Sequence, residues 1–121
     1  MAQATFLQAP GTIDHAPASE LAAGAVVVVG NIIGITKTII PANEMGTINV
    51  EGQFRVVKKT GSVAKGDILY WDVDGDPVGG TAGSGAASTV RASGDKVLGH
   101  AVAAAGANDE TVDVELRNYT S

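Results

Sequence analysis

Cysteine is absent from the sequence, which excludes disulfides and thiolate chemistry and leaves the redox compartment undetermined. Histidine is scarce as well: His15 and His100 are the only two, and they do not form an H-x-x-x-H spacing. A zinc site would need both imidazoles to converge with a distant carboxylate. The sequence therefore predicts no metal site.

Charged side chains are also few. They make up 17% of the chain, against roughly 25% in a typical soluble domain, and the net charge is −5. The eight basic residues are scattered, with only Lys58 and Lys59 adjacent. Because nucleic-acid backbones are bound by clustered Lys and Arg, we predict no nucleic-acid partner. Two explanations for the low charge stay open: a surface rich in Thr, Ser, Gly and Asn, or a surface covered in an assembly.

Long hydrophobic runs are missing. A membrane-spanning helix needs about 20 apolar residues, whereas the run over residues 21–29 is interrupted by Gly24 and ends at Gly30. Residues 1–15 lack a basic region followed by an apolar core, so no signal peptide is expected. We therefore predict no membrane partner.

Aromatic residues are rare, with one Trp, two Tyr and two Phe among 121 residues. A core would have to be built from Val, Ile and Ala. Tyr70 and Trp71 are adjacent, so on a strand they point to opposite faces. One of them is expected in the core and the other at the surface or an interface, where Trp and Tyr are enriched.

What the sequence does have is strand-forming residues. Nine of the sixteen residues in 25–40 are Val or Ile, which fit pleated surfaces better than helices. We predict a hairpin of residues 25–29 and 32–37 that turns at Gly30-Asn31. In residues 111–117 apolar and charged side chains alternate, as in a half-buried antiparallel strand.

Further strands are expected along the chain, and only residues 16–24 could form a single helical turn. We interpret residues 47–57 as one strand that bends at a bulge at Gly52. The other predicted strands cover residues 67–73, 88–93 (a short edge strand) and 96–105. The predicted fold class is all-β, a small β-barrel or β-sandwich, with an arm or first strand over residues 1–20 and one β domain over 21–121.

Two halves of the chain resemble each other. Residues 21–29 parallel 63–71, and residues 42–52 parallel 107–117, with Thr47 and Val50 recurring as Thr111 and Val114. The second half would carry residues 75–88, a Gly- and Ser-rich segment, as an inserted surface loop, flexible or disordered before binding. Duplication of a half and chance similarity both remain open.

No catalytic or cofactor motif is complete. Asp72, Asp74 and Asp76 begin like a calcium loop, but its sixth and twelfth positions hold Pro and Gly instead of Gly and Glu. The Gly-rich segment lacks the lysine of a phosphate-binding loop, and Ser84 lacks the first Gly of a nucleophile elbow. We therefore predict no catalytic residue, no cofactor and no enzymatic activity.

Four segments in this order resemble the phage capsid cement, or decoration, proteins: AAGAVVVVGNIIGITKT, GTINVEGQFRVVK, AKGDILYWD and LGHAVAAAGANDETVDVELR. The resemblance covers residues 21–117 and lies in the order and spacing of the segments, since each alone is a common strand-and-turn pattern. The closing turn GANDET and the long Gly-rich insertion depart from the family pattern. Members are often labelled as predicted RecA/RadA recombinases, a label that the missing phosphate loop and the acidic charge argue against here.

The resemblance implies a structural protein of the bacteriophage virion. It would be made in the host cytoplasm and bind the major capsid protein on the outer capsid surface, at capsomer junctions, as a homotrimer or a dimer, and stabilise the head against internal pressure. Five residues are predicted to contact the capsid or another copy: Thr5, Phe6, Leu7, Gln8 and Trp71. Alternative functions are a head-fibre or tail subunit, or a small β-barrel ligand-binding module.

Overall fold

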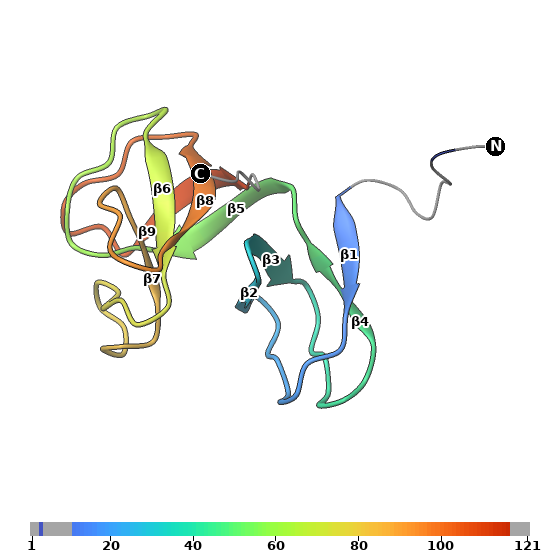
Figure 1. Ribbon diagram of the computed structural model, residues 1–121. Helices are drawn as coiled ribbons and strands as arrows, with labels where there is room; N and C mark the ends of the chain where they lie inside the picture. The colour runs from blue at the N-terminus through green and yellow to red at the C-terminus, as the bar shows by residue number, and fades with distance from the viewer. Residues whose placement is uncertain (1–2, 4–10, 117–121) are drawn as a thin grey trace.

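The computed structural model describes residue 3 and residues 11–116, and these form only β-strands and connecting turns (Figure 1). The strands make two antiparallel sheets that lie next to each other. The predicted all-β class is confirmed, as a small sandwich of two sheets and not as a closed barrel. No helix occurs in the described part of the chain: around Leu21, where a helical turn was expected, the backbone forms a bridge with Ile40 instead.

The first sheet contains the first four strands in the order β1-β4-β3-β2. Their bounds are Thr12–His15 for β1, Val26–Val29 for β2, Ile32–Thr36 for β3 and Gly46–Asn49 for β4. The predicted hairpin is confirmed, because β2 pairs with β3 from Val29↔Ile32 outward and turns at Gly30-Asn31. Gly30 has a φ of +62°, the left-handed conformation that such two-residue turns require.

The second sheet has the order β5-β9-β8-β6-β7. Its strands are Gly52–Val57 (β5), Ile68–Asp72 (β6), Ala86–Ser88 (β7), Lys96–Ala101 (β8) and Thr111–Leu116 (β9). The short edge strand is indeed at the sheet edge, but it occupies 86–88 and not 88–93. The alternation in β9 is confirmed: Val112, Val114 and Leu116 are buried.

The segment 47–57 is two strands and not one bent strand. β4 belongs to the first sheet and β5 to the second, and the chain crosses between them at Val50-Glu51. Gly52 has a φ of +113°, which a residue with a side chain rarely adopts. The strand pairing is therefore interrupted completely at this point, and not by a bulge. The two parts of the apolar segment 47–57 belong to different sheets.

The two halves of the chain have the same topology. Omitting β7, the order β5-β9-β8-β6 repeats the order β1-β4-β3-β2. The flanking bridges repeat too: Leu21 pairs with Ile40, and Val63 with Ala105. Each half therefore contains one copy of a four-strand unit, and the second copy carries β7 and the Gly-rich loop as the predicted insertion.

The strand registers fix the equivalent residues of the two units. Val26↔Ile35 in the first unit corresponds to Ile68↔His100 in the second. The pair Thr36↔Ile48 then corresponds to Ala101↔Val114. The sequence comparison paired Val50 with Val114, two residues away from the structural match. A shift of two keeps every side chain on its face, so the alternating pattern alone could not detect it.

Two apolar clusters hold the sheets. A small one inside the first unit centres on Val27, Ile40 and Ile48. The larger cluster fills the second unit and also includes Ile33 and Ile35 of β3, which joins the sheets. The small cluster is tight: a Cβ on Gly34 would lie 2.5 Å from the Ile48 side chain.

Candidate docking surfaces

One buried lysine organises the loops at an end of the second sheet. Lys58 is 1% exposed, and its Nζ donates to backbone carbonyls. The acceptors are Lys59 and Gly106 at 3.0 Å, Ala107 at 3.3 Å and Asp109 at 3.4 Å. Its own backbone receives the Val78 N–H at 2.9 Å. Lys58 thus joins β5 to the turn before β9 and to the Gly-rich loop.

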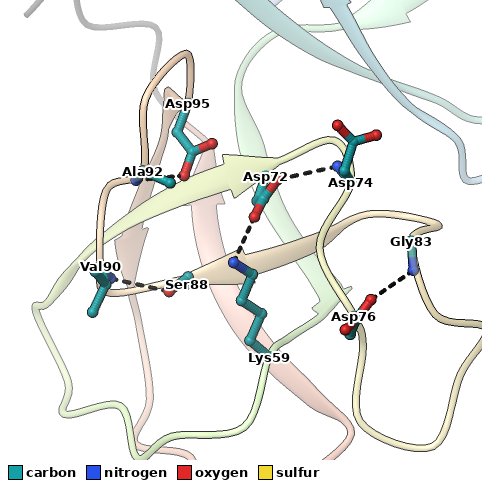
Figure 2. Close-up of polar contacts among 9 residues, drawn as sticks. All are labelled: Lys59, Asp72, Asp74, Asp76, Gly83, Ser88, Val90, Ala92 and Asp95. Atoms are coloured by element: carbon teal, nitrogen blue, oxygen red, sulfur yellow. Dashed lines mark hydrogen bonds and ion pairs between the residues drawn. The ribbon is translucent and has the colours of Figure 1, made fainter.

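The Gly-rich segment, predicted as an inserted surface loop, is connected to the rest of the second unit by backbone hydrogen bonds such as that from the Val78 N–H to the Lys58 carbonyl. Two of the three carboxylates that resembled a calcium loop, those of Asp72 and Asp76, accept hydrogen bonds in this segment, and Asp74 contributes its backbone N–H (Figure 2). Asp72 pairs with Lys59 and accepts the Asp74 N–H, and Asp76 accepts the Gly83 N–H at 2.7 Å. In the described residues, no group of three or more side chains is arranged to hold a metal ion.

The adjacent aromatics divide as the alternation rule requires. Trp71 is 7% exposed and belongs to the large core cluster. A Cβ on Gly85 would lie 2.7 Å from its ring, so only glycine lets the loop cover the indole this closely. Tyr70 is half-buried, and the Arg91 guanidinium lies 5.5 Å from its ring centroid. Within one protomer, Trp71 is a core residue and Tyr70 is the aromatic that reaches the surface.

Four of the five predicted contact residues, Thr5 to Gln8, lie outside the described residues. The strand that follows them, β1, pairs with β4 of its own chain, and Val50 N–H donates to the Gly11 carbonyl at 2.9 Å. The chain therefore enters the fold along an edge of the first sheet. The two histidines are in different sheets, His15 at the end of β1 and His100 in β8.

A groove of about 550 Å³ separates the first sheet from the Gly-rich loop. Its apolar lining comes from β2, β3, β5 and β6, and includes Val26, Ile35, Phe54, Val57 and Trp71. Thr81 and Ser84 of the loop line the opposite side. No acidic side chain lines it, although the whole chain has a net charge of −5. Arg55, its single charged lining residue, is paired with Asp113 at 2.8 Å.

Large apolar side chains are exposed at two other places. Ile39 and Met45, in the loop between β3 and β4, are 60% and 69% exposed. Val73 and Val90, in the loops on either side of β7, are 56% and 71% exposed. Exposed side chains of this size on a chain with so little charge mark surfaces suited to contact with another protein.

Two ion pairs lower the pKa of their carboxyl groups. Hydrogen bonding from Lys59, and next from the Asp74 N–H, lowers the pKa of Asp72. Hydrogen bonding from Arg55 lowers the pKa of Asp113 and raises the pKa of the guanidinium. Both carboxylates are therefore held ionised by their basic partners.

The sequence model of the phage cement protein family matches residues 7–116. The chain belongs to this family. No curated protein and no solved structure gives a significant match. Membership gives the cement protein a structural role in association with the phage capsid, and confirms the family suggested by the order of the four sequence segments. In the described residues, no helix is long and apolar enough to cross a membrane.

Sequence reasoning found some of these surfaces and not others. It singled out the aromatic pair and the loop carboxylates, which the structure places around the Gly-rich loop. It missed Lys58 and the groove, because both depend on segments far apart in the sequence: Lys58 contacts residues 106–109, and the groove combines β2 with residues 77–85. The adjacent Lys58-Lys59 pair gave no signal that one ammonium is buried.

Proposed function

We propose that this protein decorates the outer surface of the mature phage head at capsomer junctions and stabilises the shell against the pressure of packaged DNA. It acts without chemistry, as an oligomer, preferably a trimer, that binds several coat subunits at once. The family match over residues 7–116 is the observation that carries this proposal. An oligomer on a symmetry axis of the shell gains avidity, because dissociation requires the loss of several contacts together.

Surface chemistry supports an adhesive role. Charge is sparse, and the β3–β4 loop exposes Ile39 and Met45 at one end of the first sheet. The neighbouring residues Pro41 and Ala42 are also exposed and uncharged, and the two charged residues of the loop, Lys37 and Glu44, have opposite signs. We assign this loop to the coat contact, because an interface core is depleted of charge and rich in apolar side chains.

Binding to expanded, undecorated shells of the phage tests the proposal. Purified protein should co-sediment with these shells, should not bind free coat subunits, and should raise the temperature at which the shells rupture. A stable preparation that neither binds nor stabilises expanded shells would refute the decorating role.

Two matched variants test the assigned contact. Met45→Asp should weaken shell binding at least tenfold, because it replaces the most exposed apolar side chain of the loop with a second carboxylate beside Glu44. Val90→Asp, a change of similar exposure in the second sheet's loops, should bind as the wild type does. The reverse order of effects would move the coat contact to the loops beside β7.

A further inference from the structure

The duplicated topology leaves one strand edge without a counterpart. In the second unit, β7 covers the outer edge of β6 through the pairs Tyr70↔Ser88 and Trp71↔Ala87. In the first unit, the equivalent strand β2 is the last strand of its sheet, with no strand beside it among the described residues. The pairing of β7 with β6 therefore shows how an added strand could pair with the equivalent edge of β2.

The edge of β2 is suited to pairing. Thr36 N–H donates to the Ala25 carbonyl at 3.0 Å, so the backbone of Ala25 points toward β3. Because an antiparallel ladder alternates, the N–H and C=O groups of Val26 and Val28 point away from β3. All four residues of β2 are Val, without the Lys or Pro that commonly protects an edge strand from pairing.

The groove described above opens beside this edge. Gly24, Ala25 and Val26 line one side, and Thr81 and Ser84 of the Gly-rich loop line the other. Because the groove is bounded by β2 on one side and by the Gly-rich loop on the other, a single added strand is the smallest element that could pair with this edge. The missing acidic side chains and the apolar floor favour a segment that is uncharged and carries apolar side chains.

Residues 4–10, ATFLQAP, have this chemistry. They carry no charge and include Phe6 and Leu7. Ten residues precede Gly11, enough to span up to about 33 Å when extended. One row of paired residues crosses the first sheet from β1 to β2: Thr12, Asn49, Ile35 and Val26. The arm therefore starts three strand spacings, about 14 Å, from β2.

We propose that residues 4–10 of one copy add a strand to the β2 edge of another copy, in the groove between β2 and the Gly-rich loop. Within one chain the arm would have to turn back across the whole first sheet, from the β1 edge to the β2 edge. An arm that comes from another copy does not have to cross that sheet. The contact joins two different edges, β1 and β2, so it is head-to-tail, the kind of contact from which cyclic oligomers such as a trimer are built.

Single cysteines test this directly, since the chain has none of its own. Full-length Phe6→Cys and Thr81→Cys proteins are mixed and treated with a short bifunctional thiol reagent. We expect cross-linked heterodimers in at least tenfold excess over a mixture of Phe6→Cys with Val90→Cys, whose cysteine lies outside the groove. No excess over that control would overturn the proposal.

Other outcomes identify other occupants. An internal link in the double variant, without heterodimers in the mixture, would place the arm in its own groove and overturn the exchange. Protection of Thr81→Cys from a thiol reagent only after binding to shells, without cross-linking to Phe6→Cys, would assign the groove to a coat segment. Either result leaves capsid decoration intact, because shell binding is measured separately.

Two proline substitutions in β2 test whether the arm pairs with the backbone of this strand. Val26→Pro removes an N–H that points outward, so the β2–β3 ladder stays intact while strand addition is blocked. It should reduce heterodimer cross-linking at least tenfold. Val27→Pro removes an inward N–H and should impair folding instead. Wild-type cross-linking in the Val26→Pro background would contradict pairing at β2.

Discussion

At the scale of single residues, Lys58 has the clearest structural role. Its buried ammonium binds four backbone carbonyls, that of Lys59 just after β5 and three in the turn before β9. Lys58→Met keeps the aliphatic stem but removes this donor from all four; the Gly106 and Ala107 carbonyls still accept backbone N–H groups, whereas those of Lys59 and Asp109 lose the ammonium as their donor. We expect a loss of about 3 kcal/mol in the free energy of unfolding, measured by urea titration, since unpaired buried polar groups cost about 1–3 kcal/mol each. Lys65→Met, on an exposed side chain, should change stability by less than about 0.5 kcal/mol.

The ion pair of Lys59 and Asp72 predicts how stability varies with acid. The folded pKa of Asp72 lies below its ordinary value, so the pair stabilises the fold above about pH 4 and the contribution is lost as pH falls through the folded pKa. Lys59→Met should therefore be less stable than the wild type at pH 7, and the difference should shrink as the pH falls below about 4. Thermal unfolding across this range measures it. A difference that persists undiminished at pH 2 would show that packing of the lysine stem, and not its charge, is what matters.

At the scale of elements, the duplicated unit makes the insertion replaceable. In the first unit Gly30-Asn31 joins Val29 to Ile32, and in the second unit the equivalent pair is Trp71↔Lys96. Replacing residues 72–95 with Gly-Asn should give a protein that retains its β-sheet circular dichroism. Trp71 would lose its cover from Gly85 and β7, so its fluorescence should shift to the red. A chain that fails to form β-sheet would show that the second unit depends on its insertion.

Strands could be predicted from the sequence where a local pattern, either a run of β-branched residues or a strict alternation of apolar and polar residues, is enough to identify them. The Val-rich hairpin and the alternating β9 are local patterns, and both were correct. The break at Gly52 was missed because Ile48 and Val56 continue one alternation although they belong to different sheets. β7 was placed two residues late, since its small residues Ala86 and Ala87 resemble the Gly-rich loop before them. Their burial, 0% and 1% exposed, results from contacts distant in the sequence.

At the scale of the whole molecule, the proposed adhesion to the shell rests on apolar and backbone contacts and not on charge. Net charge is −5, the groove has no acidic lining, and the β3–β4 loop presents Ile39 and Met45. Exposed charge pairs are screened by salt, whereas apolar burial and backbone pairing are not. A tenfold increase in sodium chloride should therefore change the shell dissociation constant by less than about threefold. Titration of labelled protein onto expanded shells at two salt concentrations measures this. A steep loss of binding at high salt would show that the few charged side chains, and not the apolar loop, hold the protein on the shell.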